Sequence, residues 1–223
     1  MATGKERVAI VLATGNRDKV RELRPMLEGI SPVLEVLSLA DLGLSPGIDE
    51  TEPTLEGNAR LKADEAYRLV EGRFDRFIAL ADDTGLEVDA LGGAPGVRSA
   101  RYAPAPEGAT PSYEENVAHL LRSMAGVDSR TARFRTVIAM KGRLAMPVDE
   151  TVDGRIEGSI TTARRGERGF GYDPVFLPEG SARTFAEMAV DEKNAVSHRG
   201  RAVSAASIRI RELLEQSGFP TNP

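Results

Sequence analysis

The sequence predicts an α/β fold in which a mixed β-sheet is flanked by helices. Short apolar runs alternate with amphipathic segments between Val8 and Ala81, which is the order of elements that builds layered α/β domains. Two long strand-like segments follow one another further along the chain, with a turn between them. This pair predicts a hairpin, so we expect the sheet to be mixed and bent.

The first part of the chain reads as buried strands with helices between them. Val20, Leu23 and Leu27 recur at helical spacing, and Thr54 is a favourable N-cap for the second helix. Predicted strands are residues 8–13, 34–39 and 77–81; predicted helices are residues 16–28 and 55–70; an acidic, Gly/Pro-rich loop spans residues 41–53.

The rest of the chain has fewer helical patterns. Residues 92–111 are rich in Gly, Pro and Ala, which predicts a loop without regular structure. We expect one domain of residues 1–223 with two lobes and a central cleft. The remaining predicted elements are a strand at 86–88, a helix at 112–124, hairpin strands at 133–141 and 148–160, a loop at 167–174 and a helix at 203–214.

Composition excludes several kinds of chemistry. The chain has no Cys and only two His, at positions 119 and 198, so thiolate and multi-histidine metal sites are excluded. A metal would have to be held by carboxylates, which favours Mg²⁺, Mn²⁺ or Ca²⁺. The net charge of −5 argues against bulk attraction to nucleic acid or anionic membrane. No targeting or membrane-spanning run is seen, so we expect a cytoplasmic protein.

A polar segment follows the first predicted strand and opens the first helix. Amide groups at a helix start suit a phosphate, and a lysine one turn further on adds a point charge. The alternative, of about equal weight, is an ordinary turn with Asn16 as N-cap. The segment is Thr14, Gly15, Asn16, Arg17, Asp18 and Lys19.

Acidic residues gather at two places. Asp82 and Asp83 follow a buried strand, where they could hold a metal and activate water, or form an Asp-rich turn into the next strand. The acidic loop 49–52 precedes a helix that carries Lys62. Taken alone, this loop is better explained as acids that favour the helix dipole, but a second carboxylate becomes useful beside a metal at Asp83.

Two later segments suggest a binding surface. The glycines of the loop 169–174 permit close backbone approach, and its aromatics offer a stacking face; alternatively, the aromatics fill the core. A donor-rich patch precedes the last predicted helix, where surface basic residues and caps are an equally good explanation. The patch is Lys193, His198 and Arg199.

Taken together and in this order, these motifs resemble the inosine triphosphate pyrophosphatase family. The segment 81–97, ADDTGLEVDALGGAPGV, carries the most specific part of a match that covers almost the whole chain. The resemblance implies an elongated mixed sheet with two lobes, a central nucleotide-binding cleft and a homodimer. It also implies Mg²⁺-dependent hydrolysis of inosine, deoxyinosine and xanthosine triphosphates to the monophosphate and pyrophosphate.

The resemblance assigns a role to each motif. Asp83 would be the catalytic carboxylate and a metal ligand, with Glu50 preferred over Asp49 and Glu52 as its acidic partner. Lys62 and the segment Thr14, Gly15, Asn16, Arg17, Asp18 and Lys19 would hold the triphosphate; Thr84, Phe170, Gly171, Tyr172, Asp173, Lys193, His198 and Arg199 would hold the nucleoside.

The chain departs from the family pattern at three places. Glu52 and Pro53 stand where many relatives have Gly and an apolar residue, Leu55 replaces a usual Phe, and residues 103–112 form a longer, Pro-rich segment to which we assign no role. Two other functions remain open: a septum-inhibitor-type pyrophosphatase acting on pyrimidine or modified nucleotides, and a nucleotide-binding sensor without turnover. Neither nucleic acid nor membrane is an expected partner.

Overall fold

A mixed α/β fold is confirmed by the computed structural model, which describes residues 7–45, 47 and 50–222. The described residues form a seven-stranded sheet with strand order β2-β1-β3-β5-β6-β7, and β4 pairs with β3. The strands are β1 (Val8–Leu12), β2 (Leu34–Ser38), β3 (Phe77–Val88), β4 (Pro95–Gly96), β5 (Thr131–Arg143), β6 (Pro147–Ile160) and β7 (Phe176–Pro178).

Most helices begin where the sequence places a cap. The side chain of Asn16 caps α1, Thr54 caps α2, and Ser112 forms a capping box with Glu115 at the start of α3. The helices are α1 (Arg17–Glu28), α2 (Leu55–Val70), α3 (Tyr113–Ser123), α4 (Val190–Val196) and α5 (His198–Gln216). Among the described residues, no helix combines the length and apolar character needed to cross a membrane.

The chain divides into two compact units. Unit 1 comprises residues 1–83, 137–153 and 202–223, and unit 2 comprises residues 84–136 and 154–201. In unit 1, β1 is buried along its whole length and pairs in parallel with both β2 and β3, as expected for a strand that is apolar throughout.

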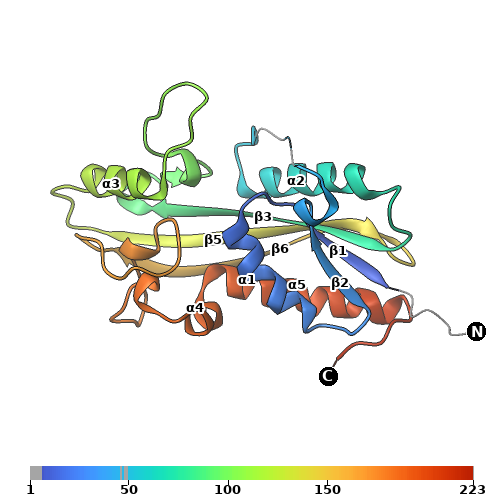
Figure 1. Ribbon diagram of the computed structural model, residues 1–223. Helices are drawn as coiled ribbons and strands as arrows, with labels where there is room; N and C mark the ends of the chain where they lie inside the picture. The colour runs from blue at the N-terminus through green and yellow to red at the C-terminus, as the bar shows by residue number, and fades with distance from the viewer. Residues whose placement is uncertain (1–6, 46, 48–49, 223) are drawn as a thin grey trace, which may run out of the picture. The chain divides into compact units, whose positions relative to one another are not determined.

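Helices cover both faces of the sheet in unit 1 (Figure 1). Helices α1 and α5 lie on one face, and α2 lies on the other. Side chains of β3 alternate accordingly, because successive strand residues point to opposite faces. Ile78 and Leu80 join the core under α1 and α5, whereas the ring of Phe77 lies 5.2 Å from that of Tyr67 on α2.

Unit 2 has its own aromatic core. The second half of β3 pairs antiparallel with β4, and β6 pairs antiparallel with β7. Phe134 lies at the centre, with its ring 4.7 Å from that of Phe176 and 6.2 Å from that of Phe185. Leu120 of α3 is fully buried in the same cluster.

Several expected boundaries are wrong. Asp82–Gly85 is not a turn, because β3 runs through it: residues 77–80 pair with β1, and Leu86 and Glu87 pair with β4. Regular structure also occurs within 92–111, where β4 and a 3₁₀ turn at Ser99–Arg101 lie. Strand β7 and helix α4 were not predicted, because they are too short to carry a clear periodic pattern.

The last helix begins five residues earlier than the predicted start at 203. Helix α5 starts at His198 because the Ser197 hydroxyl accepts a hydrogen bond from the Gly200 amide at 3.1 Å, as an N-cap does. His198 and Arg199 therefore lie in its first turn rather than before it. The hairpin of β5 and β6 is confirmed, whereas the single domain and the cleft stay predictions.

We expect Gly142→Ala to lower the free energy of unfolding by about 1–3 kcal/mol, the usual cost of overpacking. A Cβ at this position of β5 would lie 2.1 Å from the Phe77 carbonyl oxygen, so the two strands would have to separate. Gly29→Ala is the matched control, since nothing lies within 4 Å of its Cβ position, and its effect should stay within about 0.5 kcal/mol. Equal losses in urea unfolding would contradict the packing argument.

Candidate functional site

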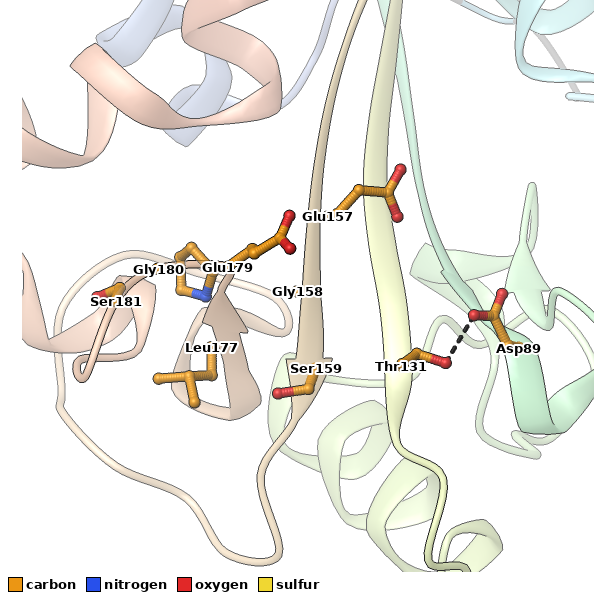
Figure 2. A pocket seen from close by; sticks show the side chains of 10 residues that line it. Asp89, Thr131, Glu157, Gly158, Ser159, Leu177, Glu179, Gly180 and Ser181 are labelled. Atoms are coloured by element: carbon orange, nitrogen blue, oxygen red, sulfur yellow. Dashed lines mark hydrogen bonds between the residues drawn. The ribbon is translucent and has the colours of Figure 1, made fainter.

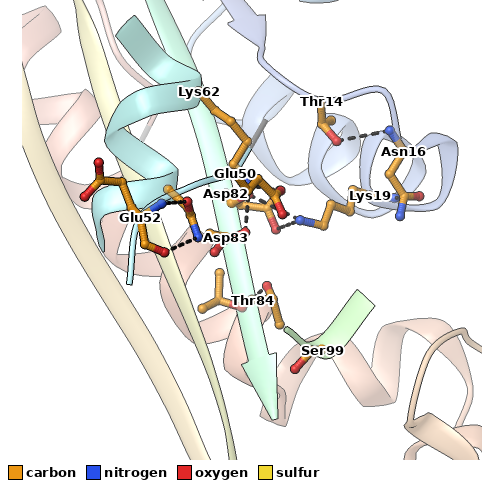
Figure 3. A network of polar contacts seen from close by, with 12 residues as sticks. Thr14, Asn16, Lys19, Glu50, Glu52, Lys62, Asp82, Asp83, Thr84 and Ser99 are labelled. Atoms are coloured by element: carbon orange, nitrogen blue, oxygen red, sulfur yellow. Dashed lines mark hydrogen bonds and ion pairs between the residues drawn. The ribbon is translucent and has the colours of Figure 1, made fainter. Parts of the chain in front are cut away.

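Two neighbouring carboxylates on β3 each bind a lysine, and the two lysines come from helices on opposite faces of the sheet. The Lys19 ammonium of α1 lies 3.0 Å from Asp82 Oδ2, and the Lys62 ammonium of α2 lies 2.7 Å from Asp83 Oδ1. Figure 3 shows these contacts at the strand. The alternation of side chains along a strand explains why adjacent aspartates have different partners.

Lys62 also contacts a third acid. Its ammonium lies 3.1 Å from Glu50 Oε1, so it bridges Glu50 and Asp83. The side chains of Lys62 and Asp83 are 11% and 9% exposed, and that of Asp82 is fully buried. These five groups, two ammonium ions facing three carboxylates, form the charged cluster of unit 1.

Burial and charge act against each other in this cluster. Burial raises the pKa of the Asp83 carboxyl above its usual value, although the Lys62 ammonium acts in the opposite direction. Burial alone would lower the pKa of Lys62, but the negative charges of Asp83 and Glu50 outweigh it and raise the pKa. Lys62 is therefore a permanent cation, and Asp83 is a carboxylate that accepts a proton more readily than an ordinary aspartate.

The donor set of the cluster fits Mg²⁺. Glu50 Oε1 and Asp83 Oδ1 both approach one cationic position, which the Lys62 ammonium marks, and Mg²⁺ prefers such oxygen ligands. Across residues 7–45, 47 and 50–222, no three His, Asp or Glu side chains form a metal-holding group. Mg²⁺ is commonly held by one or two carboxylates with waters and substrate oxygens, so two are enough.

Asp49 and Glu52 are the other two acids considered as the acidic partner of Asp83. Asp49 lies outside the described residues. Glu52 is described, and Figure 3 shows its carboxylate directed away from Lys62 and Asp83. Of the described residues of the acidic loop, Glu50 is thus the one whose carboxylate contacts the cluster.

The segment between β1 and α1 forms a capped turn. Asn16 Oδ1 accepts hydrogen bonds from the amides of Asp18 and Lys19 at 2.9 and 3.3 Å, which confirms it as the N-cap, and Thr14 Oγ1 accepts from the Asn16 amide. Asp18 pairs with Arg21 at 3.0 Å. Gly15 and Arg17 are exposed. The link from this segment to the charged cluster is the ammonium of Lys19.

In unit 2, Asp173 ties the glycine-rich loop to α4. Its Oδ2 accepts from the Phe170 amide at 2.9 Å and from the Lys193 ammonium at 2.7 Å. A Cβ at Gly169 would lie 2.0 Å from this oxygen, and Gly169 has φ +73°, so only glycine permits the turn. Asp173 and Lys193 are both buried.

Two cationic side chains lie close to the Phe170 ring. The Lys193 ammonium lies 5.1 Å from the centre of the Phe170 ring, and the Arg199 guanidinium lies 5.2 Å from it. His198 stacks on Phe134 with ring centres 4.4 Å apart. Arg199 Nη2 lies 3.4 Å from Thr84 Oγ1. Donors and a half-buried aromatic face therefore occur together in this unit.

Some residues behave differently from the expectation. Tyr172 does not offer a stacking face: it is buried in the core of unit 2 and donates to the Ser99 carbonyl at 2.9 Å. Gly171 is half-buried with φ +61°. Sequence reasoning missed Thr136, whose hydroxyl lies 2.7 Å from that of Thr84, because a single buried Thr within a strand pattern carries no signal.

A separate hollow of about 500 Å³ lies on unit 2 (Figure 2). Asp89, Glu157 and Glu179 contribute carboxylates to its lining, and Arg133 pairs with the first two. It contains none of the expected site residues, and its acidic lining would repel a triphosphate. We therefore do not assign it to the substrate.

Comparison with known proteins gives a consistent set of relatives. A family model described as the Ham1 family matches residues 10–207. A dITP/XTP pyrophosphatase from Chlorobaculum tepidum is 65% identical and covers 95% of this chain and 96% of its own. A HAM1 protein structure from Coxiella burnetii is 36% identical with a TM-score of 0.78, covering 92% of this chain and 99% of its own.

A further solved structure carries an activity in its name. It is a nucleoside-triphosphatase, or dITP/XTP pyrophosphatase, from Mycobacterium abscessus. It is 38% identical, has a TM-score of 0.67, and covers 89% of this chain and 98% of its own.

Proposed function

Because the chain belongs to the Ham1 family, we propose that it hydrolyses deaminated purine nucleoside triphosphates, namely ITP, dITP and XTP, to the monophosphate and pyrophosphate. The resemblance inferred from the motifs is confirmed by the family match and by relatives named dITP/XTP pyrophosphatases. These names favour this reaction over the septum-inhibitor type and over a sensor without turnover. The observation that carries the proposal is the buried Lys62 bridging Asp83 and Glu50.

The charged cluster supplies the groups that this hydrolysis needs. Lys19 and Lys62 would bind phosphate oxygens as compact positive charges. Asp83 would accept a proton from the attacking water. The water oxygen would bond to phosphorus while the bridging P–O bond between the α and β phosphates breaks. The raised pKa of Asp83 makes it a better proton acceptor than an ordinary aspartate. Bound Mg²⁺, held by Glu50 and Asp83, would neutralise charge that develops on the phosphates.

The residues around Phe170 in unit 2 are the proposed contacts of the nucleoside. The half-buried Phe170 ring would stack on the base. His198 and Arg199 would donate hydrogen bonds, with Lys193 held in place by Asp173. Thr84 and Tyr172 would support these nucleoside contacts through their hydrogen bonds, which Thr84 makes with Thr136 and Tyr172 makes with the Ser99 carbonyl.

We expect Mg²⁺ as cofactor, a homodimer as the working state, and a cytoplasmic location. The net charge of −5 supports the absence of nucleic acid and membrane from the partners.

We expect Mg²⁺-dependent release of pyrophosphate from ITP without stepwise release of orthophosphate. The measurement is a panel of triphosphates with pyrophosphate and orthophosphate quantified separately at early times. Chelation should abolish turnover, because the phosphate charges would lose their counter-ion. Equimolar orthophosphate from the start would instead indicate a γ-phosphatase.

Asp83→Asn should lower kcat at least ~10²-fold, because the amide neither accepts the water proton nor carries the charge that holds the metal. The substitution preserves the shape of the side chain, so thermal unfolding should still be cooperative.

The pH dependence provides a second readout for Asp83. With its pKa raised by burial, kcat/KM of the wild type should fall, as pH decreases, at a higher pH than for an ordinary aspartate. Protonation of Asp83 removes the proton acceptor. The residual activity of Asp83→Asn should therefore not show this fall in kcat/KM as the pH decreases. Near-normal turnover of the variant would move the role of base elsewhere.

Lys19→Ala should lower kcat/KM roughly 10²-fold or more, whereas Lys141→Ala should leave it nearly unchanged. Both lysines pair with an aspartate in unit 1, Lys19 with Asp82 at 3.0 Å and Lys141 with Asp64 at 2.5 Å. Only Lys19 belongs to the charged cluster. Comparable defects in the two variants, measured with ITP, would mean that the phosphate site is misplaced.

Base preference should follow the hydrogen-bond pattern of the purine. Hypoxanthine and xanthine present a 6-oxo acceptor, whereas adenine presents a 6-amino donor that would meet His198 and Arg199 donor to donor. Each group left unpaired costs ~1–3 kcal/mol, so two give roughly 10²-fold or more against ATP. Guanine shares the 6-oxo group and differs at its 2-amino group, so discrimination against GTP needs rejection near C2. We expect ITP and XTP well ahead of GTP, and GTP at or above ATP, in kcat/KM.

The corresponding variants test the same argument. His198→Ala or Arg199→Ala should narrow the gap between ITP and ATP by lowering the value for ITP. Equal hydrolysis of ATP and ITP by the wild type would overturn the substrate assignment and leave the pyrophosphatase chemistry in place.

A further inference from the structure

A buried asparagine on α2 fastens the acidic loop to the helix. Asn58 is 1% exposed, and its side chain bonds both backbone groups of Glu52. Asn58 Oδ1 accepts from the Glu52 amide at 3.0 Å, and Asn58 Nδ2 donates to the Glu52 carbonyl at 3.3 Å. A carboxamide suits this task because it carries a donor and an acceptor side by side.

The neighbouring residue permits the close approach. A Cβ at Gly57 would lie 2.6 Å from Glu52 Cβ and 2.9 Å from its Cγ, so any larger residue would push the loop away from α2. Thr54 Oγ1 accepts from the Gly57 amide at 3.0 Å and fixes the first turn of the helix. Asn58 and Gly57 together form what we name the loop latch.

The latch and the charged cluster share one helix face. Asn58 and Lys62 are four residues apart on α2, so they are neighbours along its surface. The latch holds Glu52, and Glu50, two residues earlier in the chain, contacts Lys62 at 3.1 Å. The position at which the loop is fastened therefore determines where the Glu50 carboxylate can reach.

We propose that Asn58 is a positioning residue that holds the Glu50 carboxylate on the same cationic position as Asp83 and thereby sets the affinity of the protein for Mg²⁺. This inference rests on the proposed metal role of Glu50 and Asp83. It assigns to Asn58 a function beyond stabilising the end of a helix.

The test measures Mg²⁺ binding to the nucleotide-free protein by isothermal titration calorimetry with MgCl₂ alone. Asn58→Ala should weaken binding about 10-fold or more, the usual range when a residue that orients a metal ligand is removed. At saturating Mg²⁺, kcat with ITP should return to near the wild-type value, since the ligands themselves remain.

The matched control is a second buried asparagine that clamps a loop in unit 2. Asn116 Oδ1 accepts from the amides of Tyr102 and Ala103 at 3.0 and 2.8 Å, and its Nδ2 donates to the Ala100 carbonyl at 3.1 Å. Asn116→Ala should lower the melting temperature as Asn58→Ala does but leave the Kd for Mg²⁺ unchanged. A merely structural role of Asn58 would make the two variants alike.

A second variant covers the case in which Asn58→Ala does not fold. Gly57→Ala leaves Asn58 in place and improves helix propensity, yet it displaces Glu52, so it too should weaken Mg²⁺ binding several-fold. Unchanged Mg²⁺ affinity in the folded variants, or an equal loss of Mg²⁺ affinity in Asn116→Ala, would overturn this inference and leave the proposed metal site in place. A wild-type protein that binds no Mg²⁺ would overturn the proposed metal site and this inference with it.

Discussion

Two adjacent buried carboxylates on one strand constrain how the helices of unit 1 must be placed. Asp82 and Asp83 point to opposite faces of β3, so each needs a cation from a different helix, and α1 and α2 supply Lys19 and Lys62. Removing one partner of a buried pair leaves an uncompensated charge and typically costs ~3–5 kcal/mol. The observed order of elements satisfies this constraint: the helix after β1 covers one face, the helix before β3 covers the other, and each presents its lysine where the aspartates lie.

The same constraint shows which parts of the fold could be predicted from sequence. The bounds of α2 were predicted correctly because its N-cap and apolar spacing are local signals. The predicted strand ends at Ala81 because acidic and glycine residues such as those of Asp82–Gly85 are typical of turns. Lysines 21 and 63 positions away from their aspartates in sequence allow the strand to continue through this segment. That compensation is tertiary, so a local pattern does not contain it. The start of α5 was missed for a related reason, since its N-cap, Ser197, precedes polar residues that carry no apolar periodicity.

Within the candidate site, the charged residues could be predicted from sequence, but the orientation of the aromatic residues could not. Asp83 and Lys19 were singled out by their own motifs, whereas the roles of Lys62 and Glu50 came from the family resemblance. In the structure Lys19 contacts Asp82, and Lys62 contacts both Asp83 and Glu50. Tyr172 and Phe170 lie two positions apart in one glycine-rich loop, yet one fills the core and the other is half-buried beside two cations. Asp173 binds the Phe170 amide and Lys193 at once, whereas the Tyr172 hydroxyl donates to the Ser99 carbonyl. Sequence supplies the residue types of such a loop, but not which aromatic is turned inward.

The charge balance of the cluster has a consequence for how a triphosphate would be recognised. Two ammonium groups already face three carboxylates, so these five groups carry one surplus negative charge. A site of this kind differs from a purely basic phosphate pocket, because a bare triphosphate would meet repulsion from Glu50 and Asp83 as well as attraction from the lysines. A divalent cation held by Glu50 and Asp83 would reverse this balance, because it would add positive charge for the phosphate oxygens beside that of Lys19 and Lys62. The carboxylates that repel a bare anion would then be the groups that couple nucleotide binding to the metal, and burial would strengthen that coupling because little water remains to screen it.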